Sequence, residues 1–164
     1  MDEAENAARV VADRVATEAM ALGISLATAE SCTVGLISHL LGRTPGVSAV
    51  FLGGIIAYGN EAKRDLLDVP AELLARHGAV SEPVALAMAR GARARFGAAL
   101  AVSTTGVAGP GGGSMEKPVG LVYIALSSTA GEDCRRFQFA GRRDTIMFGA
   151  ASEALKLVLA SLVR

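Results

Sequence analysis

The strongest constraint on the fold is the alternation of short apolar runs with longer segments of helical periodicity. The short runs have the length and composition of strands, and they lie at 24–29, 47–58, 98–106, 119–128 and 133–140. The longer segments carry apolar side chains at helical spacing, and they lie at 3–22, 33–41, 60–69, 70–78, 82–96 and 143–163. Strands alternating with helices in this way predict an α/β protein.

The last two strands refine this prediction. They follow each other with only a short connection, which favours antiparallel pairing. In the second of them Phe137 and Phe139 alternate with Arg136 and Gln138, as expected for a strand with one solvated face. Residues 1–164 are therefore expected to form a single three-layer α/β/α domain with a mixed parallel and antiparallel sheet.

Charge and cysteine content exclude several classes of function. Sixteen basic residues balance sixteen acidic ones, so we expect no nucleic-acid partner. The basic segment 135–144 is interpreted as a solvated strand edge and helix start. Cys32 and Cys134 are far apart and accompany only two histidines, so neither a metal nor another cofactor is expected.

Nothing in the sequence indicates a membrane protein. The amino terminus is acidic and lacks the basic start and apolar core of a signal peptide. The apolar run at 47–59 is too short and too rich in glycine to span a bilayer. We therefore expect a cytoplasmic protein without a membrane partner.

The first of three polar clusters is Glu30-Ser31-Cys32-Thr33, at the junction of the strand 24–29 and the next helix. If the helix starts near Thr33, the free N–H groups of residues 31–35 favour a phosphate or an oxyanion. Ser31 is then either a nucleophile or a simple helix cap. Cys32 is a second candidate nucleophile, because a thiol near a helix start has a lowered pKa.

The second cluster, Tyr58-Asn60-Lys63, follows the strand segment 47–58. A serine nucleophile needs a base, and His39 lies about two turns along the same helix, too far to reach back. Lys63 serves as a base if burial lowers its pKa from about 10.4, with Tyr58 relaying a proton or orienting the amine. The alternative is an ordinary solvated lysine on a helix.

The third cluster is the glycine-rich segment 103–113, which begins in the last residues of the strand 98–106 and continues beyond it. It matches neither the P-loop nor the dinucleotide-binding pattern. Its N–H groups are able to surround an anion, and the alternative is a plain surface loop.

Taken together, these clusters resemble the CinA carboxy-terminal domain family, over about residues 8–163. The resemblance is carried, in order, by "TAESCTVGLIS", "GGIIAYGNEAKRDLLDV", "HGAVSEPVALAMARGARARFGAALAVSTTGVAGPGGG", "KPVGLVYIAL" and "FAGRRD". Enzymes of this family are nicotinamide mononucleotide amidases of pyridine-nucleotide salvage, which release ammonia without a metal. The resemblance also implies a homodimer whose substrate is a small-molecule nucleotide.

The same resemblance implies roles for particular residues. Ser31 corresponds to the nucleophile and Lys63 to its base, with Tyr58 in support. The remaining residues are expected to line the substrate site: Glu30, Cys32, Thr33, Gly35, Asn60, Thr105, Gly106, Gly109 and Gly112. Either the glycine-rich loop or the helix start after Ser31 is expected to hold the substrate phosphate.

Four positions depart from the family pattern. Val34 and Gly59 replace the usual Gly and Ser, Arg142 stands where an acid is usual, and Met147 replaces an arginine. A side chain at position 34 is expected to crowd the site. The departures keep open an alternative function, a non-catalytic module that binds a nucleotide or a partner.

Overall fold

A five-stranded mixed sheet forms the centre of the molecule. The computed structural model describes residues 3–164, and its strands are β1 (Leu26–Glu30), β2 (Phe51–Ile56), β3 (Leu100–Gly106), β4 (Leu121–Ser128) and β5 (Gly131–Gln138). Their order in the sheet is β2-β1-β3-β4-β5. β1 runs parallel to β2 and β3, whereas β4 is antiparallel to both β3 and β5. The predicted mixed sheet is confirmed.

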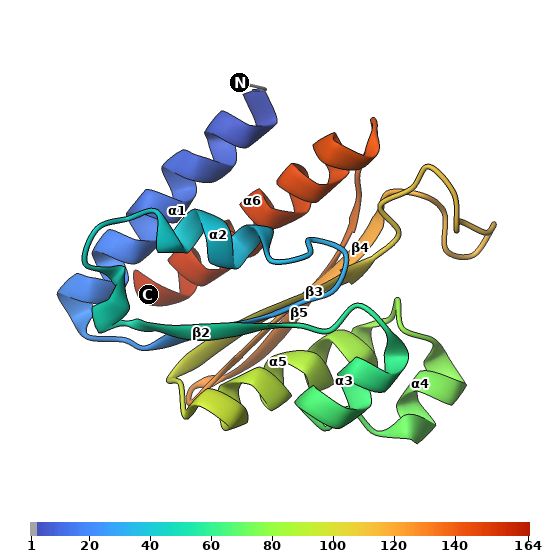
Figure 1. The fold of residues 1–164 in the computed structure, drawn as a ribbon, viewed down its shortest axis with the longest axis horizontal. Helices are drawn as coiled ribbons and strands as arrows, with labels where there is room; N and C mark the ends of the chain where they lie inside the picture. The colour runs from blue at the N-terminus through green and yellow to red at the C-terminus, as the bar shows by residue number, and fades with distance from the viewer. Residues whose placement is uncertain (1–2) are drawn as a thin grey trace.

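Helices cover both faces of this sheet (Figure 1). One face carries α1 (Glu3–Leu22), α2 (Leu36–Gly42) and α6 (Arg143–Leu162), and the other carries α3 (Asn60–Leu67), α4 (Ala71–His77) and α5 (Glu82–Phe96). This arrangement is the expected three-layer α/β/α domain. The boundaries of α5 match the prediction, and those of the other long helices differ from it by at most one residue.

Small side chains let the layers pack closely. On α1 the buried positions are Ala8, Ala12, Val15, Ala16 and Ala19. α6 lies against α1 (Figure 1) and is long and apolar enough, by length and composition alone, to cross a membrane. Because 56% of its most apolar window is buried inside the fold, packing accounts for its composition.

The segment predicted as one or two strands at 47–58 is a short 3-10 helix, Val47–Ala49, followed by β2. The register between β1 and β2 shifts between Leu26 and Ala27, where β2 has the consecutive glycines Gly53 and Gly54. Such a shift is typical of a β-bulge. A Cβ atom on Gly54 would collide with the hydroxyl oxygens of Thr28 and Ser38. The lack of a side chain therefore allows β2 to approach β1 and α2.

The predicted start of the helix after Ser31 is wrong. The helix expected from near Thr33 begins only at Leu36, because Val34 (φ 49°) and Gly35 (φ 86°) adopt the left-handed conformation, which no right-handed helix contains. Ser81 occupies the position before α5, but its hydroxyl donates to the Gly78 carbonyl (2.8 Å) and does not cap the helix.

Candidate active site

The carboxyl ends of the three parallel strands bring the first two polar clusters together. Ser31 follows β1 directly, and its main-chain N–H donates to the carbonyl of Thr104 on β3 (3.0 Å). On the other side of β1, Ala57 N–H donates to the carbonyl of Glu30 (2.9 Å), which fixes the start of the segment after β2. In α/β proteins this edge of the sheet is the usual place for a site.

Ser31 and Lys63 meet at this edge. Lys63 Nζ lies 3.0 Å from Ser31 Oγ, within hydrogen-bond distance. Both residues are buried, with exposed fractions of 7% for Ser31 and 1% for Lys63. The ammonium also donates to the main-chain carbonyl of Tyr58 (2.9 Å). Burial lowers the pKa of Lys63 because the charged form loses hydration.

α3 determines where the lysine lies. Gly59 precedes the helix, and its carbonyl accepts the Lys63 N–H (3.1 Å), so Lys63 stands at the end of the first turn. The helix lies close to α5, because Gly91 leaves room for the Leu67 carbonyl that any side chain there would strike. Lys63 is thus buried by the packing of α3, and the alternative of a solvated lysine is wrong.

Glu30 is fully buried and organises the turn that carries Ser31. Its carboxylate accepts from Thr33 Oγ1 (2.6 Å), from Ser38 Oγ (2.7 Å) and from the N–H groups of Ile37 (3.1 Å) and Ser38 (2.8 Å). These N–H groups belong to the first turn of α2. The start of this helix, which we expected to receive a phosphate or an oxyanion, therefore already holds a carboxylate of the protein.

Cys32 and Thr33 lie in the turn after Ser31, and both are buried. Burial raises the pKa of the Cys32 thiol to about 12, so the expected lowering of its pKa is wrong. Thr33 Oγ1 lies 2.8 Å from Thr104 Oγ1 on β3. The turn is thus tied both to Glu30 and to the neighbouring strand.

Thr105 and Thr104 point to opposite faces of β3, as successive strand residues do. Thr105 is buried and donates to the carbonyl of Ala79 (2.8 Å), which holds the segment before α5. Thr104 therefore contacts the Ser31 turn, whereas Thr105, which was expected to line the substrate site, contacts the segment before α5.

The remaining expected site residues form no hydrogen bond with the side chain of Ser31 or Lys63. Gly35 precedes α2, Asn60 is exposed at the first residue of α3, and Gly106 ends β3. Gly109 is buried, whereas Gly112 is exposed farther along the same loop. Among residues 3–164 there is no cluster of three or more His, Cys, Asp or Glu side chains that would hold a metal.

Arg143 contacts both the glycine-rich loop and Tyr58, and the sequence had not singled it out. Its guanidinium donates to the Gly109 carbonyl (2.7 Å) and to the Tyr58 hydroxyl (3.2 Å). Tyr58 thus reaches in two directions, with its carbonyl toward Lys63 and its hydroxyl toward Arg143. The only sequence signal was the position of Arg143 within the "FAGRRD" element, since these contacts join segments far apart in the chain.

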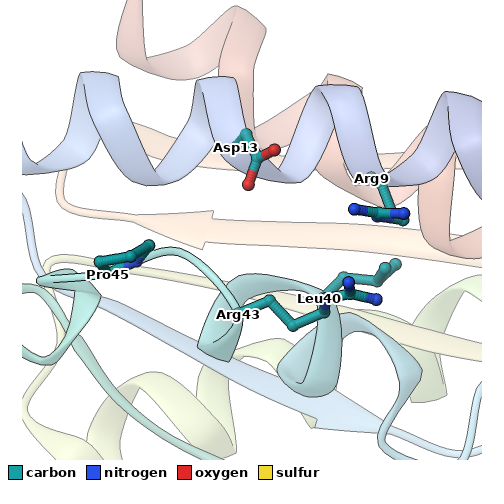
Figure 2. Close-up of a pocket in the computed structure, with 5 residues that line it drawn as sticks. All are labelled: Arg9, Asp13, Leu40, Arg43 and Pro45. Carbon is teal, nitrogen blue, oxygen red and sulfur yellow. The ribbon is translucent and has the colours of Figure 1, made fainter.

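A separate cavity of about 210 Å³ lies between α1 and α2, away from the serine–lysine pair. Figure 2 shows its lining residues: Arg9, Asp13, Leu40, Arg43 and Pro45. The Asp13 carboxylate in this cavity accepts from Thr44 Oγ1 (2.8 Å). Since neither Ser31 nor Lys63 lines it, the cavity is not part of the candidate active site.

The fold and this site define an α/β protein with a buried serine–lysine pair at the carboxyl ends of parallel strands. A model of the CinA C-terminal domain matches residues 8–162. The chain therefore belongs to the CinA C-terminal domain family.

Three known proteins illustrate this membership. A CinA-like protein of Anaeromyxobacter dehalogenans strain 2CP-1 is 50% identical over 146 residues, covering 89% of this chain and 36% of the relative. A CinA-like protein of Parasynechococcus marenigrum strain WH8102 is 53% identical over 135 residues, which cover 80% of this chain and 32% of the relative. The crystal structure of competence/damage inducible protein CihA from Agrobacterium tumefaciens is 42% identical, with a TM-score of 0.92 and 96% of each chain covered. The chain spans about a third of the length of the curated relatives.

Proposed function

We propose that this domain is a nicotinamide mononucleotide amidase that hydrolyses the carboxamide to a carboxylate and releases ammonia. The observation that carries the proposal is the 3.0 Å contact between Lys63 Nζ and Ser31 Oγ, both buried. A lysine whose pKa is lowered by burial has a larger neutral fraction than an ordinary lysine, and the neutral amine is able to accept a proton. A cytoplasmic place in pyridine-nucleotide salvage follows from the family resemblance.

In the first half of the reaction, Ser31 Oγ attacks the carboxamide carbon while the neutral Lys63 amine takes the hydroxyl proton. The main-chain N–H groups of Cys32 and Thr33, in the turn after the serine, are the proposed donors to the oxyanion. The C–N bond breaks, and the lysine returns its proton to the departing nitrogen. Ammonia leaves, and the serine carries the acyl group as an ester.

In the second half, a water molecule replaces ammonia beside the same lysine. Lys63 takes a proton from this water as its oxygen attacks the ester carbon. The Ser31 oxygen then leaves and recovers the proton from the lysine, which regenerates the neutral amine and the free serine. The net change is one amide and one water converted to one acid and one ammonia, with no oxidation or reduction.

Tyr58 supports this mechanism through its main chain. Its carbonyl accepts one proton of the amine (2.9 Å), so the nitrogen lone pair is directed away from it and toward the serine when the lysine is neutral. The phenol makes its contact with Arg143, at the other end of the residue. We therefore propose that Tyr58 orients the lysine and does not relay a proton.

The test is ammonia release from nicotinamide mononucleotide by the purified protein, compared with the Ser31→Ala and Lys63→Ala variants. We expect each variant to lose at least about 10³-fold in kcat, because nucleophile and base act as a unit. Ser48→Ala and Lys156→Ala are the matched controls, since both residues are exposed and remote from the pair, and they are expected to keep full activity.

Two outcomes would contradict the proposal in different ways. Ammonia release that survives in both variants would refute the serine–lysine mechanism. Tight nucleotide binding by the wild-type protein without any ammonia release would instead favour the alternative of a non-catalytic binding module.

A further inference from the structure

The serine–lysine pair leaves open where the substrate phosphate binds, and a site for that phosphate rests on the proposed function. Of the two places expected from the sequence, the start of α2 is already filled. The Glu30 carboxylate accepts from the N–H groups of Ile37 (3.1 Å) and Ser38 (2.8 Å). These N–H donors are therefore already used, and a phosphate there would meet carboxylate oxygens that are acceptors like its own.

The glycine-rich loop remains, and the structure adds a cation beside it. Arg143 donates to the Gly109 carbonyl (2.7 Å) and to the Tyr58 hydroxyl (3.2 Å), which are both uncharged partners. Within residues 3–164, no carboxylate forms an ion pair with Arg143. Its positive charge is thus half-buried and uncompensated beside the loop, whereas Arg90, for example, is paired with Glu132 (2.6 Å).

A continuous set of contacts connects this guanidinium to the reacting pair. Arg143 contacts the hydroxyl of Tyr58, the carbonyl of Tyr58 contacts Lys63, and Lys63 contacts Ser31. A single tyrosine residue therefore separates the nucleophile and its base from the cation. A mononucleotide carries a carboxamide at one end and an anion at the other, which are the groups that the serine–lysine pair and the guanidinium would engage.

We propose that Arg143, held beside Gly109 of the glycine-rich loop, binds the substrate phosphate and selects a mononucleotide over the corresponding nucleoside. Two of its N–H groups are used in the contacts described, and its other N–H groups are able to donate to phosphate oxygens. Arg143 is then a specificity-determining residue, and Tyr58 and Gly109 fix the direction of its side chain.

A purely structural role predicts something different. If Arg143 only ties the loop to Tyr58, its removal disturbs the lysine and lowers turnover of every amide substrate alike. If it binds phosphate, its removal affects only substrates that carry phosphate. Comparing two substrates that differ only in the phosphate therefore separates the two roles.

The experiment measures kcat/KM for nicotinamide mononucleotide and for nicotinamide riboside in the wild-type, Arg143→Met and Arg143→Lys proteins. We expect Arg143→Met to lower kcat/KM about 100-fold for the mononucleotide, and to leave the riboside within about threefold, a margin typical of surface changes. Arg143→Lys keeps the charge and is expected to restore part of the preference. Arg136→Met is the matched control, since it removes an exposed arginine from the edge strand β5.

An equal loss on both substrates, or no loss on the mononucleotide, overturns the proposal while leaving the amidase function standing. If the wild-type protein hydrolyses neither substrate, the amidase function fails, and calorimetric binding decides the role of Arg143. Nicotinate mononucleotide is then compared with nicotinate riboside. A phosphate-dependent gain in affinity that disappears in Arg143→Met supports the proposal, and its absence from the wild-type protein overturns it.

Discussion

At the scale of single residues, the main feature of the candidate site is a desolvated lysine. Lys63 is 1% exposed, and its amine contacts a hydroxyl and a main-chain carbonyl, neither of which carries a charge. The neighbouring Cys32 thiol, whose pKa burial raises to about 12, is neutral near pH 7 and supplies no anion. Desolvation therefore acts on the lysine largely unopposed, and its pKa falls below the ordinary value of 10.5.

The first prediction concerns the pH dependence of this residue. We expect kcat/KM to rise with pH along a limb whose midpoint lies below 10.5, because only the neutral amine accepts the serine proton. A pH–rate profile measures this limb. It should disappear in Lys63→Arg, since a guanidinium does not lose its proton in this range. A limb that persists in Lys63→Arg would assign it to another group.

The lowered pKa of Lys63 also makes the stability of the protein depend on pH. Between the lowered pKa and 10.5 the unfolded chain binds more protons at this position than the folded one, so the free energy of unfolding rises with pH in that window. Lys63→Met removes this contribution. Urea titrations at several pH values should therefore show a shallower slope for the variant than for the wild-type protein.

Val34 leads to the second prediction. It is a β-branched residue at φ 49°, a conformation that costs a non-glycine residue about 1–2 kcal/mol, and it is 43% exposed, so packing offsets little of this strain. Val34→Gly is expected to raise the melting temperature by about 2–4 °C. Val10→Gly, at an exposed position in the middle of α1, is the control and should lower it. A lower melting temperature for Val34→Gly would show that the valine contributes contacts that outweigh the strain.

These residues mark the limit of what the sequence predicted. Ser31 and Lys63 were candidates by residue type and by their positions after strands, but a helix cap and a solvated lysine stayed open, and the resemblance to the CinA family implied their roles. The role of Glu30 beneath the turn was not predicted, because it depends on donors from Thr33, Ile37 and Ser38 that only the folded turn directs inward. Arg143 was missed for a similar reason, since its partners are distant in sequence.

At the scale of elements, the connection from β1 to α2 shows why a boundary was misplaced. Apolar periodicity downstream of Thr33 predicted a helix from that point, but periodicity carries no information about the sign of φ. The two left-handed residues before Leu36 create the turn that presents Ser31, and Glu30 then satisfies the first N–H groups of α2. The late helix start is thus part of the site and not an irregularity beside it.

The packing of α3 on α5 leads to the third prediction. A Cβ atom on Gly91 would strike the Leu67 carbonyl, which is main chain and has little freedom to move. Gly91→Ala should therefore displace α3, lower the free energy of unfolding by about 1–3 kcal/mol and, through Lys63, reduce the proposed amidase activity.

Gly42→Ala is the matched control for this change. A Cβ atom there meets nothing within 4 Å, and the residue also lies in a helix. Chemical denaturation should show unchanged or slightly higher stability for Gly42→Ala. Equal stability of Gly91→Ala and the wild-type protein would mean that α3 tolerates a shift without loss.

At the scale of the whole molecule, hydrophobic periodicity was enough to predict the class of fold. Each of the five strands and each of the six α-helices was expected close to its observed position, because buried runs and amphipathic stripes are local signals. The distribution of helices between the two faces was not predicted, since it depends on how the crossover connections turn. Nor did the sequence show that Thr104 contacts the turn after Ser31.

The association state is the fourth prediction, and it derives from the family resemblance. We expect a homodimer, so sedimentation equilibrium should give roughly twice the chain mass of 16.7 kDa. β2 forms one edge of the sheet and exposes Leu52 and Ile56, which makes this edge a candidate for the interface. A single species of the monomer mass at high protein concentration would contradict the expectation.

The main-chain acceptor for Lys63 has a consequence for how such a protein evolves. No change of codon at position 58 deletes a carbonyl oxygen, so the alignment of the amine survives whatever residue stands there. Substitution of the ring would instead alter the contact with Arg143, while the carbonyl that accepts from Lys63 is kept. Swapping that ring is accordingly a rational first step for laboratory redesign of substrate preference.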